Sequence, residues 1–258
     1  MKIKKIEIRC HDRKMNVLLQ MPDKENPPAI IMVHGFGGEG LDEYFIDTGK
    51  KLSESGFCVV NFLFSGYNDF PDVSNLTIKD SIEDLRCIVD FVYKQNIDKN
   101  RIAIVAQSLG CVITMLYTDD RIKAAAFLGP TINVKESFSF LFKRANILEE
   151  LEEKGIATYT SISSKVDKKI GITLWNEIKK IDHITEEQIK KNKIPVLIIR
   201  GTADTLVDAG ESKKLYEILN EPKKLFLVQD APHSTTKNPK QRGIVVQEIS
   251  TWFNKWLR

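Results

Sequence analysis

Short, mostly apolar runs recur along this chain, and most are followed by a stretch with the period of an amphipathic helix. The runs include AIIMV, RIAIVA, IKAAAFL and IPVLIIR, and the clearest helix is predicted at 78–93, where apolar residues recur at intervals of four and three. Such runs are typical of strands that are buried on both faces. Strands that alternate with helices form a parallel sheet wrapped on both sides, so the pattern predicts an α/β fold.

Two N-terminal strands complete the predicted sheet. KIKKIEIRC and KMNVLLQMP flank HDRK as the two arms of an antiparallel hairpin. Together with the buried runs FCVVNFLF and KKLFLVQD they predict eight strands, most of them parallel. Further helices are predicted at 41–55, at 108–118, at about 208–219 and at the C-terminal end of the chain.

The alternation of strands and helices stops between residues 131 and 192. This segment contains the aromatic stretch SFSFLFKRA, the charged helix ILEELEEK, a predicted hairpin of ATYTSISS and KIGITL around KVDKK, and two short helices, WNEIKKI and TEEQIKKN. We therefore predict a core made of 1–130 and 193–258, with a small lid at 131–192 inserted after the sixth strand.

Composition limits the function classes that this chain can serve. The 258 residues carry a net charge of +3, with basic and acidic residues interspersed, so no nucleic-acid partner is expected. No run approaches the ~18 consecutive apolar residues of a membrane span, and the N-terminus lacks the apolar stretch of a signal peptide. We expect a cytoplasmic protein that is a monomer or a homodimer.

The four cysteines show no metal-ligand spacing. Cys10, Cys58, Cys87 and Cys111 are scattered, with no CxxC motif and no Cys/His pattern. We expect reduced thiols in a reducing compartment, and we expect neither a metal nor an organic cofactor.

Chemically reactive residues follow four of the buried strands. HGFGG, QSLG, GTADTLVD and DAPHS each come directly after an apolar run. Because the carboxyl ends of parallel strands meet at one rim of a sheet, a glycine-rich loop and Ser108, Asp204 and His233 are expected there together. The chain order Ser, Asp, His is the order of a nucleophile-elbow hydrolase.

On these motifs the chain resembles the α/β-hydrolases over nearly its full length, and in particular cinnamoyl and medium-chain acyl esterases and serine aminopeptidase-like enzymes. The resemblance implies that Ser108 is the nucleophile, that His233 is the general base and acid, and that Asp204 orients the imidazole. It places an oxyanion hole at the backbone N–H groups of Phe36 and Leu109.

Each of these residues also has an ordinary structural interpretation. Without the other motifs, Ser108 would be interpreted as a helix N-cap. Asp208 is the alternative acid, or else the cap of the next helix. His34 is expected to shape the glycine-rich loop, and Cys111 to act as a small buried hydrophobe.

Two positions depart from the family pattern. Ala106 replaces the usual glycine before the nucleophile, where it adds only a methyl group. The stretch FLFSGYNDF replaces a sequence close to F-D-F-R-G-H-G-x-S, so the substrates of those relatives are not carried over to this chain.

The predicted reaction is the hydrolysis of a small-molecule carboxylic ester through an acyl-enzyme. A serine nucleophile argues against epoxide hydrolase and haloalkane dehalogenase chemistry. An exopeptidase, a thioesterase, or a ligand-binding module without activity are the alternatives. Phe138, Phe140 and Phe142 are expected to line the acyl pocket or to form the core of the lid, and Tyr67 is a further candidate substrate contact.

Overall fold

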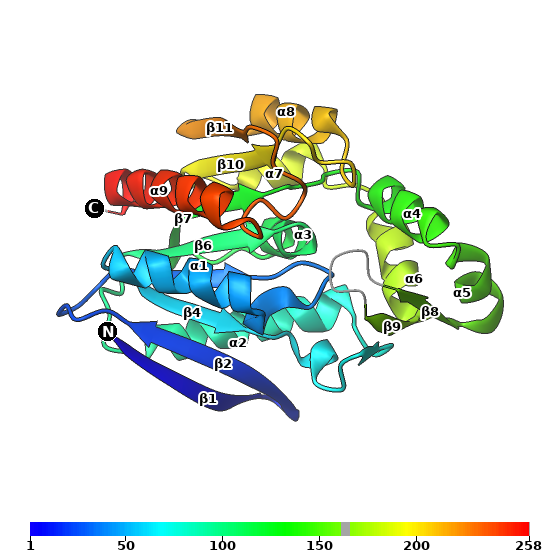
Figure 1. Ribbon diagram of the computed structural model, residues 1–258, viewed down its shortest axis with the longest axis horizontal. Helices are drawn as coiled ribbons and strands as arrows, with labels where there is room; N and C mark the ends of the chain where they lie inside the picture. Colours follow the sequence, from blue (N-terminus) through cyan, green and yellow to red (C-terminus); the bar gives the residue numbers. More distant parts are fainter. Residues whose placement is uncertain (161–165, 258) are drawn as a thin grey trace.

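The computed structural model describes residues 1–160 and 166–257 and contains the predicted eight-stranded sheet (Figure 1). Its order is β1-β2-β4-β3-β6-β7-β10-β11, with β1–β2 and β2–β4 antiparallel and the other pairs parallel. The α/β fold and the N-terminal hairpin are thereby confirmed. The strands are β1 (Lys2–Cys10), β2 (Arg13–Met21), β3 (Ala29–Val33), β4 (Cys58–Phe62), β6 (Ile102–Gln107), β7 (Ile122–Leu128), β10 (Val196–Gly201) and β11 (Lys223–Val228).

Helices cover both faces of the central strands, as their apolar runs predict. The expectation that KKLFLVQD is a buried strand is wrong, because β11 lies at the edge of the sheet and only Val228 in it is buried. Successive residues of a strand point to opposite faces, so Ile31 packs in one hydrophobic cluster while Ile30 packs in the other. The Ile30 side is covered by α1 (Glu43–Glu54) and α9 (Pro239–Trp256). The Ile31 side is covered by α2 (Ile78–Tyr93), α3 (Leu109–Leu116) and α8 (Ala209–Ile218).

Most of the described segment between β7 and β10 lies at the end of the sheet where the parallel strands terminate, whereas its last helix packs on α3 and α8 (Figure 1). Its elements are α4 (Val134–Arg144), α5 (Leu148–Lys154), β8 (Ile156–Thr160), β9 (Asp167–Gly171), α6 (Ile172–Ile181) and α7 (Glu186–Lys191). β8 and β9 form the predicted antiparallel pair, and the rest of that hairpin, 161–165, lies outside the described residues. The predicted strand KIGITL is too long, because Leu174 and Trp175 already belong to the buried face of α6.

Two of the attachments that hold this segment on the core are a strand pairing and a buried carboxylate, and neither was predicted. β5 (Asp72–Val73), which follows the short 3₁₀ helix η2 (Ser65–Tyr67), pairs in parallel with β9. Gly171 fits there because a Cβ would lie 2.2 Å from the Ser74 carbonyl oxygen. At the other end, the buried Glu211 carboxylate of α8 accepts from the N–H of Ile132 at 2.7 Å.

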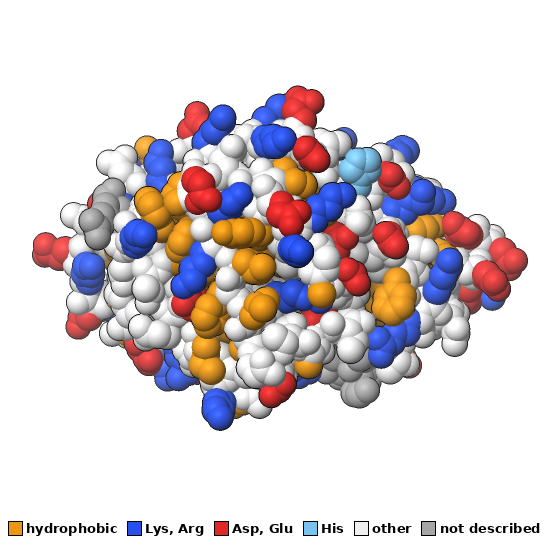
Figure 2. Space-filling view, turned by 90° about the horizontal axis from the view of Figure 1, so that it is seen from above, with side chains coloured by type: hydrophobic (Ala, Val, Ile, Leu, Met, Phe, Trp, Pro, Cys, Tyr) orange, Lys and Arg blue, Asp and Glu red, His pale blue; other side chains and the backbone are white. Residues whose placement is uncertain are grey.

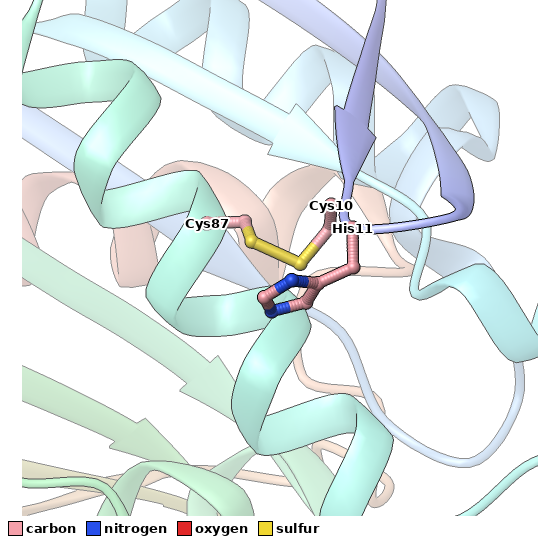
Figure 3. Close-up of side chains that lie close together, drawn as sticks. All are labelled: Cys10, His11 and Cys87. Carbon is pink, nitrogen blue, oxygen red and sulfur yellow. A yellow bond between two sulfur atoms is a disulfide. The ribbon is translucent and has the colours of Figure 1, made fainter.

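The expectation of four reduced thiols is wrong for two of them. Cys10 and Cys87 form a disulfide with a Cα–Cα distance of 5.7 Å, and His11 lies beside it (Figure 3). The two cysteines are 77 residues apart in sequence, and they come together because the end of β1 lies against α2. Cys58 and Cys111 are free and buried, and burial raises the pKa of both thiols.

The surface carries charges of both signs. On the face in Figure 2, basic and acidic side chains lie among one another, with hydrophobic side chains between them. Within the described residues, no helix is long and apolar enough to cross a membrane.

Candidate active site

Ser108 occupies a sharp turn between β6 and α3. Its backbone has φ 51° and ψ −116°, a conformation that few residues other than glycine adopt. Its N–H donates to the Leu128 carbonyl at 3.0 Å, and its side chain is partly exposed at the end of a wholly buried strand. A strained strand-to-helix turn that presents a serine hydroxyl is the geometry of a nucleophile elbow.

The sequence around the elbow fits the space available. A Cβ on Gly110 would lie 2.6 Å from the carbonyl oxygens of Val33 and His34, so only glycine is accommodated at that position. Ala106, which replaces the usual glycine, is fully buried in the sheet between β3 and β7. The elbow forms with the extra methyl group in place.

The glycine-rich loop after β3 packs directly against the elbow. A Cβ on Gly35 would lie 3.1 Å from the Cβ of Ser108. Within the described part of the chain, the N–H groups of Phe36 and Leu109 donate to no other group of the protein. Both N–H groups therefore remain available for a ligand at this place.

His34 stabilises the loop and stays neutral. Its Nδ1 donates to the Gly35 carbonyl at 2.8 Å, and its Nε2 accepts from the Phe64 N–H at 3.1 Å. Burial lowers the pKa of His34 to about 4. A neutral, fully buried imidazole with both nitrogens bonded has a structural role here, as the sequence indicated.

Two side chains that sequence reasoning did not assign to this loop bind its carbonyl groups. The Tyr67 hydroxyl donates to the Phe36 carbonyl at 2.8 Å, and the Lys168 ammonium donates to the Gly37 carbonyl. Lys168 belongs to β9, is fully buried, and lies 5.3 Å from the centre of the Phe70 ring. The inserted segment therefore helps to position the loop that carries Phe36.

Asp204 and His233 are joined by a hydrogen bond of 2.8 Å between Nδ1 and Oδ2. The Asp204 side chain is fully buried, and its other oxygen accepts from the N–H groups of Leu206 at 2.9 Å and Val207 at 3.1 Å. Burial raises the pKa of this carboxyl, but the hydrogen bonds outweigh that effect and hold it below its usual value. Asp204 is thus ionised when it faces His233.

The alternative acid has a different partner. Asp208 begins α8, and its side chain accepts from the Gly210 N–H at 2.7 Å, which is an ordinary N-cap. Of the two aspartates, Asp204 is the one bonded to His233.

His233 is held close to the strand ends by its neighbours. Gly129, at φ 57°, leaves room for the imidazole, since a Cβ there would lie 3.0 Å from its Nδ1 and Cε1. Gln107, beside the elbow, donates to the hydroxyl of Ser234 at 3.2 Å. Ser108 and His233 line one cavity, although no hydrogen bond joins their side chains in the described structure. Such bonds often tighten only when substrate is bound.

The cavity has a volume of about 130 Å³ and is mostly apolar. Of the four side chains considered for substrate binding, Phe138 is the one that lines it among the described residues. Phe142 is buried against Phe36 and Trp175, Phe140 is 49% exposed, and Tyr67 is bound to the loop. The lining residues are Gly35, Phe36, Gly37, Gln107, Ser108, Thr131, Ser137, Phe138, Leu141, Ala145, Tyr159, Leu206, Val207, His233 and Ser234.

Tyr159 was missed in the sequence, although it forms one wall of this cavity. It lies on β8, and its ring stacks on Phe36 with centroids 5.8 Å apart and planes 9° from parallel. Its position in an alternating strand gave no signal of a contact with the glycine-rich loop.

A profile of the family described as "Serine aminopeptidase, S33" matches residues 24–240. The chain belongs to this α/β-hydrolase family. The matched region includes Ser108, Asp204 and His233. The hydrolase is also 23% identical over 176 residues to the uncharacterized protein YfhR of Salmonella typhimurium, a match that covers 67% of this chain and 55% of YfhR.

Solved structures share the fold of this hydrolase. Est1E from Butyrivibrio proteoclasticus superposes with a TM-score of 0.75 at 21% identity, covering 97% of this chain and 98% of Est1E. The esterase domain of a Rhodothermus marinus protein superposes with a TM-score of 0.74 at 16% identity, and the match covers both chains completely. A further structure of Est1E contains ferulic acid. At these identities the likeness shows the fold alone.

Proposed function

We propose that this α/β-hydrolase cleaves carboxylic esters through a covalent acyl-enzyme on Ser108. The observation that carries the proposal is the 2.8 Å bond between the buried Asp204 and His233, whose imidazole opens onto the same cavity as the strained Ser108. A serine hydroxyl becomes a useful nucleophile only when a base removes its proton. Among the described residues that line that cavity, His233 is the one histidine.

The reaction follows from the roles that these groups can take. The Ser108 oxygen attacks the ester carbonyl carbon as its proton moves to Nε2 of His233, while Nδ1–H remains bonded to Asp204. The leaving alkoxide takes that proton from Nε2 and departs as the alcohol. Water then repeats the sequence on the acyl-enzyme, with His233 again as base and then as acid, and releases the carboxylic acid.

The oxyanion is assigned to the N–H groups of Phe36 and Leu109. Both donors lie beside the elbow without a partner in the described chain, so they need no reorganisation when charge develops. His34, Tyr67 and Lys168 bind the loop and act as positioning residues.

Lys168→Met tests this positioning. The change removes the donor to the Gly37 carbonyl but keeps a long side chain at a buried position. We expect kcat to fall by up to about 100-fold, because a small misplacement of a catalytic donor has effects of that size, while KM changes little. The neighbouring Lys169→Met, whose lysine pairs with Asp72 at the surface, is the control. A change confined to KM would assign Lys168 to substrate binding.

The lining of the cavity favours an ester over a peptide with a free N-terminus. No carboxylate is among the described lining residues, so an ammonium group would be buried there without a counter-charge. Phe36, Phe138, Leu141 and Tyr159 suit an aryl or medium-length acyl group. The ferulic acid in Est1E, which shares the fold, agrees with this choice.

A comparison of substrates tests the proposed function. We expect hydrolysis of aryl esters with acyl groups of about four to eight carbons, with kcat/KM rising about fourfold per methylene until the cavity is filled. Aminoacyl arylamides and acyl thioesters are assayed in parallel. Faster cleavage of the arylamide would identify an aminopeptidase, and faster cleavage of the thioester a thioesterase.

Phe138→Ala is expected to shift the preferred acyl length, because Phe138 lines the cavity. The enlarged cavity should accept longer chains, while short esters lose apolar contact and therefore kcat/KM. Phe140→Ala is the matched control, since Phe140 lies on the same helix but is 49% exposed. Identical chain-length profiles for both variants would place the acyl group elsewhere.

A further inference from the structure

A second cluster of reactive side chains lies away from the hydrolase cavity. Cys10 ends β1, His11 stands in the turn between β1 and β2, and Cys87 belongs to α2 (Figure 3). One ligand atom from each of the three lies within 4.8 Å of the other two. In the described structure this is the one group of at least three His, Cys, Asp or Glu residues with such a geometry. None of the three lines the catalytic cavity.

We propose that these three residues bind one zinc ion when the Cys10–Cys87 disulfide is reduced. Two thiolates and one imidazole are a ligand set that zinc accepts, with an open position left for water. Cys10 and His11 precede the region matched by the family profile, which begins at residue 24, whereas Cys87 lies within it.

The spacing fits a tetrahedral ion. Zn–S bonds of about 2.3 Å and Zn–N bonds of about 2.1 Å separate neighbouring ligand atoms by roughly 3.5–3.8 Å. The two cysteine Cα atoms are 5.7 Å apart, so two released sulfur atoms can move to that separation by side-chain rotation. The imidazole already faces them in Figure 3.

Ion pairs also hold the β1–β2 turn on α2, in addition to the disulfide. Arg13, at the other end of the turn, pairs with Asp80 at 2.9 Å and with the buried Asp84 at 3.3 Å, and both aspartates belong to α2. Cys10 is fully buried at the end of a paired strand. Reduction should therefore leave the hairpin on α2, with its ligands already close together.

The chemistry makes the disulfide and the metal site mutually exclusive. A phosphine reductant supplies two electrons and is oxidised to the phosphine oxide, the S–S bond breaks, and water supplies both the oxygen of the oxide and the protons of the two thiols. Zinc then replaces those protons, which pass to solvent, and the neutral imidazole donates a nitrogen lone pair. In the oxidised form each sulfur is bound to the other and cannot act as a thiolate ligand.

The test is a titration of the phosphine-reduced, full-length protein with zinc chloride in competition with a chromogenic chelator. We expect the reduced protein to bind one more zinc ion per chain than the oxidised protein or reduced Cys87→Ser. His11→Gln should weaken the affinity by about tenfold or more. His183→Gln, which changes an exposed histidine of the inserted segment, is the control and should bind as the parent does. The buried Cys58 and Cys111 are present in every sample, so any zinc that they bind cancels in the comparison.

Cobalt(II) provides a second readout that identifies the ligands. Sulfur-to-cobalt charge-transfer absorption should appear in the reduced parent, disappear in Cys87→Ser and shift in His11→Gln. Equal zinc binding by reduced parent and Cys87→Ser would overturn the site, and so would an unchanged affinity in His11→Gln. If Cys87→Ser fails to fold, the zinc affinity and the cobalt spectrum of His11→Gln still decide whether the site exists, because His11 is exposed. Ester hydrolysis is measured on the same samples, so failure of one proposal is distinguishable from failure of the other.

Discussion

Ser108→Ala should lower the turnover of an aryl ester by about 10⁶-fold, because no acyl-enzyme can form without the hydroxyl. Residual hydrolysis would come from the oxyanion donors and from substrate positioning, which remain in place. The measurement is kcat on the best ester from the chain-length series, with the thermal unfolding temperature as a check on folding. Ser55→Ala, at the exposed end of α1, is the control and should keep the parental rate.

A Ser108→Ala variant that keeps most of its activity would contradict the proposed mechanism. The hydrolysis would then have to proceed by direct attack of water or through another nucleophile. Ser137 and Ser234, which also line the cavity, would be the next residues to change.

Asp204→Asn should lower kcat by about 10⁴-fold with little effect on the fold. An asparagine can present its amide group to Nδ1 of His233, which selects the wrong tautomer and removes the negative charge that stabilises the imidazolium. The substitution is nearly isosteric, and the acceptor for the Leu206 and Val207 N–H groups can be retained by the amide oxygen.

Asp208→Asn is the matched control for this change. Asp208 caps α8 through the Gly210 N–H, and asparagine is an equally good N-cap. We expect activity and stability close to those of the parent. If Asp208→Asn were the inactive variant and Asp204→Asn the active one, the assignment of the acid would be wrong.

Most of the regular elements could be predicted because each of these follows its own local pattern, whereas the helix α4 was described only as an aromatic stretch. The helix predicted at 78–93 is α2, since its apolar residues keep the helical period from Ile78 to Val92. β5 was missed because two residues, Asp72 and Val73, are too short for any periodicity, and their pairing partner in β9 is distant in the chain. The Cys10–Cys87 disulfide was missed for the same reason, because the spacing of cysteines in the sequence does not indicate a pairing of residues 77 positions apart.

The residues of the candidate site could be predicted to lie near one another where they directly follow strands. Ser108, Asp204 and His233 come directly after apolar runs, and parallel topology brings such positions to one rim. Lys168 gave no such signal, because it stands in KVDKK, where a lysine reads as a solvated turn residue. Its burial results from the packing of β9 on the glycine-rich loop. Phe138, Phe140 and Phe142 share one aromatic stretch. The orientation in which α4 packs decides that Phe138 faces the cavity, Phe140 the surface and Phe142 the core.

Reaction with a fluorophosphonate tests the central claim most directly. The reagent phosphonylates a serine only where a base activates the hydroxyl and an oxyanion hole receives the phosphoryl oxygen, so it reports the whole arrangement at once. Intact-mass and peptide mass spectrometry of the folded protein should show a single adduct on the peptide that contains Ser108, and no adduct in Ser108→Ala or in unfolded protein. An adduct on another residue, or an unmodified folded protein, would contradict the assignment of Ser108 as an activated nucleophile.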